Sequence, residues 1–177
     1  MKTLVTYSSV TGNTEKLAFA IYDEIKGDKS ILKISEVKSL NDYDLVFIGF
    51  PIYNFQPIPE AITFMTRNTK RKNIALFTTM SLIAVPKYDQ RLELYNTTIE
   101  NCKKFCGDAH LLGIFDCPGE LNEETANALM MSDNPTLNVF GALRPLTIGF
   151  PNEKNIADAR LFAKEIGERK NFVFNLG

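Results

Sequence analysis

The sequence lacks an excess of charge of either sign. Its 177 residues include 20 lysines and arginines and 21 aspartates and glutamates, which gives a formal net charge of -1. No block of like charges stands out along the chain. A basic surface for nucleic acid and a polybasic patch for a membrane surface both require such an excess. We therefore expect neither nucleic acid nor a membrane among the binding partners.

Long hydrophobic runs and paired cysteines are missing as well. The first residues, MKTLVTYSS, lead directly into a short strand-like run, without the longer apolar segment and small-residue cleavage site of a secretion signal. No run has the ~20 apolar residues of a membrane-spanning helix. The three cysteines, Cys102, Cys106 and Cys117, are odd in number and lack the spacing of a zinc site. The sequence thus predicts a reduced, cytoplasmic protein without a metal site.

What the sequence contains is an alternation of short apolar runs with segments of helical periodicity. The apolar runs predict strands at 2–8, 31–34, 44–49, 73–80 and 109–117, the last with a kink at Gly113. Apolar residues at helical spacing predict helices at 13–26, 59–65, 89–106, 122–131 and 153–170. The alternation indicates an α/β fold, a doubly wound five-stranded parallel sheet in three layers with helices on both faces. The length suits one domain, residues 1–177.

The stretch SSVTGNT, residues 8–14, joins the first predicted strand to the first predicted helix. The strand delivers it to the carboxyl edge of the sheet, where ligands of open α/β folds bind. The helix that follows presents unpaired N–H groups and the positive end of its dipole there, which favours a phosphate. Gly12 allows close approach of the backbone, and the neighbouring polar side chains add uncharged donors: Ser9, Thr11, Asn13 and Thr14.

Two better-known phosphate motifs do not fit this stretch. No lysine follows Gly12 at the place that GxxxxGK[ST] requires, and GxGxxG is absent. Serine, threonine and asparagine are also the preferred helix caps. A cap needs one such residue, whereas the run here is nearly unbroken. Residue chemistry alone leaves both a ligand role and a capping role open.

A family resemblance favours the ligand role. The stretch YSSVTGNTEKLA, from Tyr7 to Ala18, resembles the phosphate loop of flavodoxins, small proteins that carry flavin mononucleotide (FMN). IGFPIYNFQPIPEAI (48–62) and GFPNEKNIADARLFAKEI (149–166) extend the resemblance over most of the chain. Flavodoxin is the type example of the strand order 2-1-3-4-5, with the flavin at the switch point between strands one and three. The resemblance implies this order and this cofactor.

In that family the flavin ring lies between the loops that follow strands three and four. In the first loop Tyr53 matches the usual stacking aromatic, and Phe55 is the alternative. The second loop, TTMSLIAVPKY (78–88), departs from the family pattern, which is glycine-rich or has an aromatic beside the ring. Here Met80 or Leu82 is expected to line the ring, and the main-chain amides of 79–82 to contact its pyrimidine edge. We expect this departure to alter cofactor affinity and redox potential and to leave the fold intact.

The resemblance therefore implies a set of FMN-binding residues and no catalytic residue of the chain itself. The expected set is Ser8, Ser9, Val10, Thr11, Gly12, Asn13, Thr14, Pro51, Ile52, Tyr53, Asn54, Phe55, Thr79, Met80, Ser81 and Leu82. Because the net charge is small, an apolar surface is expected to replace electrostatic steering in docking, built from Ile52, Phe55, Ile58 and Leu82. Local acids near the end of the fifth strand are Asp116, Glu120, Glu123 and Glu124.

Two functions remain open, and a third is excluded. The first is an FMN-binding electron carrier or accessory protein that delivers electrons to a partner redox enzyme. The alternative is an FMN-dependent NAD(P)H oxidoreductase that acts on a quinone or a similar acceptor. A response-regulator receiver is excluded, because Ser8–Ser9 and Gly49–Phe50 stand where it needs acidic residues. Residues 118–150 are long enough for a lid over the ring or for a partner-docking surface, and the sequence does not distinguish these.

The remaining chemically reactive side chains have structural interpretations. His110, the one histidine, falls in the fifth predicted strand, where a surface position is expected. Cys102 and Cys106 are four residues apart on a predicted helix, so they share a face and are expected in the core. Cys117 is expected to be structural too.

Overall fold

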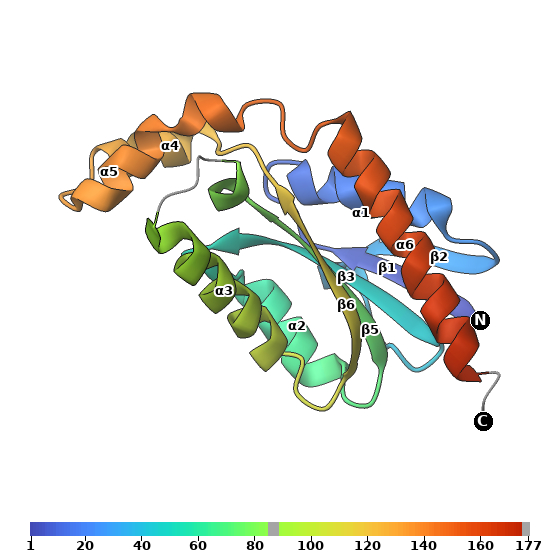
Figure 1. Cartoon of the computed structure of the whole chain (residues 1–177). Coiled ribbons are helices and arrows are strands. Elements are labelled where there is room, and N and C mark those ends of the chain that lie inside the picture. Colours follow the sequence, from blue (N-terminus) through green and yellow to red (C-terminus); the bar gives the residue numbers. More distant parts are fainter. Residues whose placement is uncertain (85–88, 175–177) are drawn as a thin grey trace.

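The strands form a twisted sheet in the order β2-β1-β3-β5-β6, and all neighbours on this path are parallel. The computed structural model describes residues 1–84 and 89–174 (Figure 1). The strands of this path are β1 (Lys2–Tyr7), β2 (Asp28–Lys33), β3 (Leu45–Tyr53), β5 (Asn73–Met80) and β6 (His110–Pro118). The predicted five-stranded order 2-1-3-4-5 is confirmed, because the two-residue strand β4 (Gln56–Pro57) lies off this path and pairs antiparallel with the end of β3.

Helices cover both faces of the sheet (Figure 1). On one face α1 (Asn13–Glu24) and α6 (Glu153–Phe174) pack against side chains that include Val5, Phe47 and Phe77. On the other face α2 (Pro59–Asn68) and α3 (Asp89–Lys104) cover a second cluster. The strand residues of both clusters are fully buried, since central parallel strands are covered on both sides and read as continuous apolar runs. Each large apolar side chain buried here contributes about 1.5–3 kcal/mol.

The predicted kink at Gly113 corresponds to an irregularity in β6. Ile74 pairs with Leu111 and the next residue, Ala75, pairs with Gly113, so the register shifts by one residue. A Cβ at Gly113 would lie 2.9 Å from Cδ1 of Ile166 on α6. Glycine at this position therefore allows α6 to pack closely against the irregular part of the strand.

Several predicted boundaries differ from the structure. The strand predicted at 31–34 begins at Asp28, because pairing with β1 extends to Lys2 beyond the apolar run. The helix predicted at 59–65 continues to Asn68, and the helix predicted at 13–26 ends at Glu24. In the second flavin loop Ser81–Ile83 forms a short 3-10 helix, and residues 85–88 lie outside the described residues.

The segment after β6 holds two α-helices where the sequence predicted one. The predicted helix at 122–131 is α4 (Glu123–Met130), and a second helix, α5 (Pro135–Ala142), follows it. The side chain of Asn134 accepts a hydrogen bond from the amide of Thr136 at 3.0 Å, and proline occupies the start of α5. A capping asparagine followed by proline is a usual signal of a helix start. No helix was predicted here because the segment that follows is short and has no charged residue. A 3-10 helix, η3 (Arg144–Thr147), leads on toward α6.

Candidate functional site

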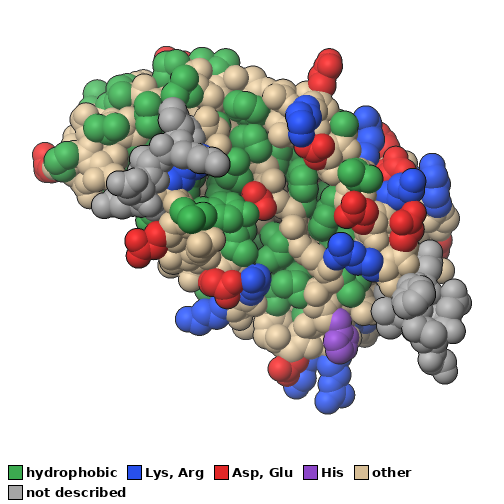
Figure 2. Space-filling view, in the orientation of Figure 1, with side chains coloured by type: hydrophobic (Ala, Val, Ile, Leu, Met, Phe, Trp, Pro, Cys, Tyr) green, Lys and Arg blue, Asp and Glu red, His purple; other side chains and the backbone are tan. Residues whose placement is uncertain are grey.

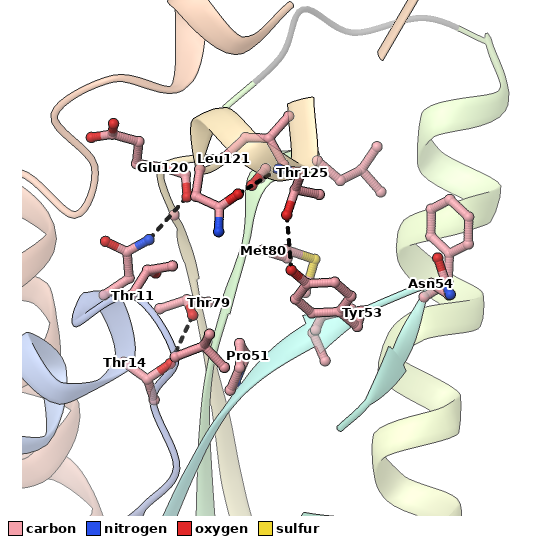
Figure 3. Close-up of a pocket in the computed structure, with 18 of the residues that line it drawn as sticks. Thr11, Thr14, Pro51, Tyr53, Asn54, Thr79, Met80, Glu120, Leu121 and Thr125 are labelled. Atoms are coloured by element: carbon pink, nitrogen blue, oxygen red, sulfur yellow. Dashed lines mark hydrogen bonds between the residues drawn. The ribbon is translucent and has the colours of Figure 1, made fainter. Parts of the chain in front are cut away.

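A cavity opens at the carboxyl ends of the central strands, between the start of α1, the end of β3 and the α4–α5 segment (Figure 3). It encloses about 990 Å³, open solvent at its mouth included. Among the residues predicted to bind FMN, all but Ser8 and Gly12 line it. The sequence therefore identified most of this cavity, while the binding role of these residues remains a prediction.

The first wall is the loop between β1 and α1. The hydroxyl of Ser9 accepts hydrogen bonds from the amides of Gly12 (3.1 Å) and Glu15 (3.3 Å), so this side chain organises the first turn of α1. Gly12 has a φ of 86°, a left-handed conformation that favours glycine. Ser8 faces elsewhere: its amide donates to the main-chain oxygen of Gly49 (2.9 Å) and its hydroxyl to Glu60 (2.5 Å). The N-cap of α1 is Gly12, which has no capping side chain, while Ser9 supports the turn from three residues earlier and Ser8 does not line the cavity.

The same loop presents donors suited to an anion. None of the hydrogen bonds found among the described residues uses the backbone N–H groups of Thr11, Asn13 and Thr14. These residues line the cavity at the start of a twelve-residue helix, where the helix dipole is positive. Of their side chains, Asn13 and Thr14 already make hydrogen bonds within the protein, to the main-chain oxygen of Glu120 and to Thr79. The donor set is therefore mainly main chain, and it fits a phosphate.

The second wall is the hairpin formed by β3 and β4. Tyr53 pairs with Gln56, and between them Asn54 and Phe55 have φ values of 48° and 60°. A two-residue turn with both φ values positive is the type I′ hairpin turn, which Asn adopts readily and Phe at a cost in strain. The Tyr53 side chain is 46% exposed and lines the cavity mouth. An aromatic side chain of that exposure has a face available for stacking.

The floor consists of the end of β5 and the turn behind it. Thr79 shares a buried hydrogen bond with Thr14, with their hydroxyl oxygens 2.9 Å apart, which ties the floor to α1. Met80 and Leu82 both line the cavity, while contact of either side chain with a flavin ring remains a prediction. Leu82, however, is 5% exposed and packs into a small apolar cluster. The prediction that Leu82 belongs to an apolar docking surface is therefore wrong.

The third wall contains none of the residues expected to bind FMN, and it falls within 118–150, the segment for which the sequence left open a lid over the ring or a partner-docking surface. It comes from the loop after β6 and from α4 and α5, and it consists of Gly119, Glu120, Leu121, Asn122, Thr125, Leu129, Leu137 and Phe140. Two hydrogen bonds connect it with the other walls: Asn13 donates to the main-chain oxygen of Glu120 at 3.0 Å, and the hydroxyl oxygens of Tyr53 and Thr125 lie 3.1 Å apart (Figure 3). Thr98 of α3 also lines the cavity.

A local signal for this wall was present in the sequence. Asn122 caps α4, with its side-chain oxygen accepting from the amide of Thr125 at 2.7 Å. A capping residue indicates where a helix begins. It does not indicate which part of the sheet edge that helix will lie against.

Figure 2 shows hydrophobic side chains gathered on the end of the molecule that α4 and α5 form. The exposed hydrophobic residues in or next to these two helices include Met131 (85% exposed) and Val139 (59% exposed).

Charge near the cavity is largely neutralised within the protein. Glu120 lines the cavity, and its carboxylate lies 3.5 Å from Arg144 and accepts a hydrogen bond from the amide of Gly149 at 3.1 Å. Arg144 lies 3.9 Å from Glu123 as well. Of the predicted local acids, Asp116 does not line the cavity: it is held by Tyr95, whose hydroxyl donates to it at 2.9 Å. Burial raises the pKa of Asp116, and burial beside Asp116 raises the pKa of Tyr95 to about 12.

The histidine and the three cysteines that the sequence analysis considered do not line the cavity. His110 is exposed at the start of β6, as predicted. Cys102, Cys106 and Cys117 are free and buried, and burial raises the pKa of Cys102 and Cys117 to about 12 and that of Cys106 to about 11. Within residues 1–84 and 89–174 no three His, Cys, Asp or Glu side chains are grouped as a metal site requires.

None of the described helices combines the length and the apolar character that a membrane crossing demands.

Comparison with known proteins relates the chain to one family. The family described as "Flavodoxin domain" matches residues 4–164. The flavodoxin-like domain-containing protein BilS of Clostridioides difficile is 31% identical over 189 aligned positions, which cover 98% of this chain and all of that protein.

Solved structures agree on the fold. A flavodoxin from the domain Archaea superposes with a TM-score of 0.59 at 15% identity, covering 97% of this chain and 99% of the other. Oxidised flavodoxin 2 from Bacillus cereus superposes with a TM-score of 0.58 at 16% identity, covering 96% and 99%. On the family match and the relative together, with a sheet order that agrees, the chain belongs to the flavodoxin domain family.

Proposed function

We propose that this chain binds FMN in the cavity and carries electrons between that flavin and a partner redox enzyme. One observation supports this most strongly: the exposed Tyr53 and three residues at the start of α1 whose N–H groups make no hydrogen bond within the described part of the chain line the same cavity. The N–H groups are suited to a phosphate and the tyrosine to a flat conjugated ring. FMN has one of each.

Each wall has a distinct part in this proposal. The amides of Thr11, Asn13 and Thr14 bind the phosphate, and Tyr53 stacks on the ring. The third wall, with Leu129, Leu137 and Phe140, shields part of the cavity from water. The bound flavin supplies the electron-transfer chemistry, while the protein fixes its position and surroundings.

The charges beside the cavity favour a carrier over an NAD(P)H oxidoreductase. A nicotinamide dinucleotide carries phosphates that basic side chains normally bind. Among the described residues that line the cavity there is no lysine or arginine, and Arg144 of η3, beside the third wall, is already paired with Glu120 and Glu123. Consumption of NADPH by the FMN-loaded protein alone would support the oxidoreductase alternative. Electron transfer that requires an added redox enzyme supports the carrier.

The phosphate role can be tested with two variants of almost equal size. Thr11 is exposed and its side chain makes no hydrogen bond found in the structure, so replacing it should not disturb folding. Thr11→Asp places a carboxylate beside the phosphate, whereas Thr11→Asn keeps the site neutral. We expect Thr11→Asp to weaken FMN binding at least tenfold, because two like charges about 4 Å apart near a protein surface repel by up to ~4 kcal/mol and a tenfold change in Kd needs only ~1.4 kcal/mol. Thr11→Asn should bind within a few-fold of the natural chain.

The measurement is a titration of the apoprotein with FMN, followed by the change in flavin fluorescence, at low and high salt. Because the effect is electrostatic, the difference between the two variants should shrink at high salt. Equal affinity of the two variants at low salt would place the phosphate elsewhere. A natural chain that binds no FMN would end the proposal altogether.

A further inference from the structure

The Tyr53 side chain is held from across the cavity mouth. It lies at the end of β3, beside a hairpin whose second strand has two residues, and it is 46% exposed. Its hydroxyl oxygen lies 3.1 Å from that of Thr125, in a hydrogen bond in which either group can donate (Figure 3). Without this hydrogen bond, an exposed tyrosine side chain changes between rotamers on the picosecond-to-nanosecond timescale.

Thr125 itself has a fixed backbone. Its amide donates to the side chain of Asn122 at 2.7 Å, in the first turn of α4. The loop that leads into this turn is fixed to its neighbours, because Gly119 donates to the main-chain oxygen of Met80 at 3.3 Å and Leu121 donates to the hydroxyl of Thr147 at 3.0 Å. The Thr125 hydroxyl is therefore presented from a well-anchored position.

We infer that Thr125 is a positioning residue, which holds the ring of Tyr53 in place for stacking on the bound flavin. This inference rests on the proposed function and adds to it a role for the third wall. Thr125 lies 72 residues from Tyr53 in the sequence. It acts through Tyr53: the bond limits the rotation of the ring before the cofactor arrives. A ring held in its bound rotamer loses less conformational freedom on binding, and affinity rises accordingly.

A double-mutant cycle tests this inference. Thr125→Val and Tyr53→Phe each remove one partner of the same hydrogen bond and keep the shape of the side chain. We expect each to raise the Kd for FMN about two- to tenfold, the range of one net hydrogen bond. The double variant should be no weaker than either single variant, because the bond is lost only once. Thr125→Ser keeps the hydroxyl and should restore the natural affinity.

Two further arms separate positioning from folding. Thr136→Val makes the same replacement on α5, at an exposed threonine that does not line the cavity, and should leave the Kd unchanged. In the apoprotein, ¹³C relaxation of the tyrosine rings should show faster motion of Tyr53 in Thr125→Val than in the natural chain.

The outcomes distinguish this inference from the proposed function. Equal ring motion in the apoproteins, equal Kd values for Thr125→Val and the natural chain, or additive losses in the double variant would each overturn the role of Thr125. A natural chain that binds no FMN refutes the proposed function and, with it, the role in stacking. The apoprotein relaxation still shows whether Thr125 restrains the ring.

Discussion

Asn13 and Glu120, 107 residues apart in the sequence, are joined by a hydrogen bond of 3.0 Å from the side-chain amide of the first to the main-chain oxygen of the second. This bond ties the loop at the start of α1 to the wall that follows β6. Both residues line the cavity. The α1 side and the third wall of the cavity are therefore joined directly by this hydrogen bond.

Replacing Asn13 by alanine should loosen this connection. We expect the Kd for FMN to rise about two- to tenfold, since one net hydrogen bond contributes ~0.5–1.5 kcal/mol. Amide hydrogen exchange of residues 119–125 should also become faster in the apoprotein. A flavin titration and an exchange experiment measure the two effects.

A matched control for Asn13→Ala exists on α2. Asn68 makes a bond of the same type, from its side-chain amide to the main-chain oxygen of Phe64 at 2.9 Å, and does not line the cavity. Asn68→Ala should leave FMN affinity unchanged. If both variants bind FMN as the natural chain does, the connection between loop and wall has no part in binding.

The geometry of the β3–β4 hairpin predicts different effects for replacing its two aromatic residues: a loss of FMN affinity for Tyr53 and a gain in stability for Phe55. Tyr53→Ala removes the stacking ring and should weaken FMN binding about tenfold, the upper range of an aromatic pair. Phe55→Gly removes a bulky residue held at a φ of 60°, and should raise the free energy of unfolding by about 1 kcal/mol.

A flavin titration and urea unfolding of both hairpin variants check this assignment. FMN affinity is expected to survive Phe55→Gly. The reverse pattern, with affinity lost in Phe55→Gly and kept in Tyr53→Ala, would assign the stacking to Phe55, the alternative that the sequence left open.

Gly141 should be needed for the packing of α5 against α4. A Cβ at this position would lie 2.6 Å from the main-chain oxygen of Ala126 and 2.9 Å from the amide nitrogen of Met130. Gly141→Ala should lower the free energy of unfolding by about 1–3 kcal/mol, the usual cost of overpacking. It should also weaken FMN binding by displacing the third wall.

Gly167 of α6 is the contrasting position, where we expect the same substitution to stabilise the protein. Urea unfolding measures the free energy of unfolding of both variants. A Cβ at Gly167 meets no atom within 4 Å. Gly167→Ala should raise the free energy of unfolding by about 0.5–1 kcal/mol, because alanine is the better helix former. A Gly141→Ala variant as stable as the natural chain would show that α4 and α5 separate without cost.

The raised pKa of Asp116 predicts that the free energy of unfolding depends on pH. Burial raises the pKa of this carboxyl above its ordinary value of 3.8. The folded chain therefore binds this proton more tightly than the unfolded chain does. Protonation of Asp116 thus adds to the free energy of unfolding, and this contribution is complete below the pKa of the unfolded state. It is lost as the pH rises from about 4 through the raised pKa of the folded state.

Asp116→Asn removes that titration and keeps an oxygen that accepts the bond from Tyr95. The free energy of unfolding of the natural chain, measured relative to this variant by urea unfolding, should fall as the pH rises from 4 toward neutrality. A difference that rises over this range, or stays constant, would contradict the raised pKa.

Much of the fold and part of the site followed from local patterns. LVFIGF within β3 is buried on both faces, and such a continuous apolar run indicates a central parallel strand. SSVTGNT marks the strand-to-helix turn that carries the N–H donors, because polar residues and a glycine with positive φ are required there. Tyr53 was assigned to the site through the resemblance to flavodoxins, and it lies at the end of this strand, where it lines the cavity.

The tertiary structure alone decided which residues close the cavity. The sequence shows that Asn122 begins a helix, and it contains no signal that Thr125 of this helix meets Tyr53 or that Asn13 meets Glu120. It likewise contains no signal that the Ser8 hydroxyl donates to Glu60 of a neighbouring helix. Strands and turns arise from residues close in the chain, so their patterns can be read locally. Contacts across 72 or 107 residues depend on how the layers pack, and only the folded molecule determines them.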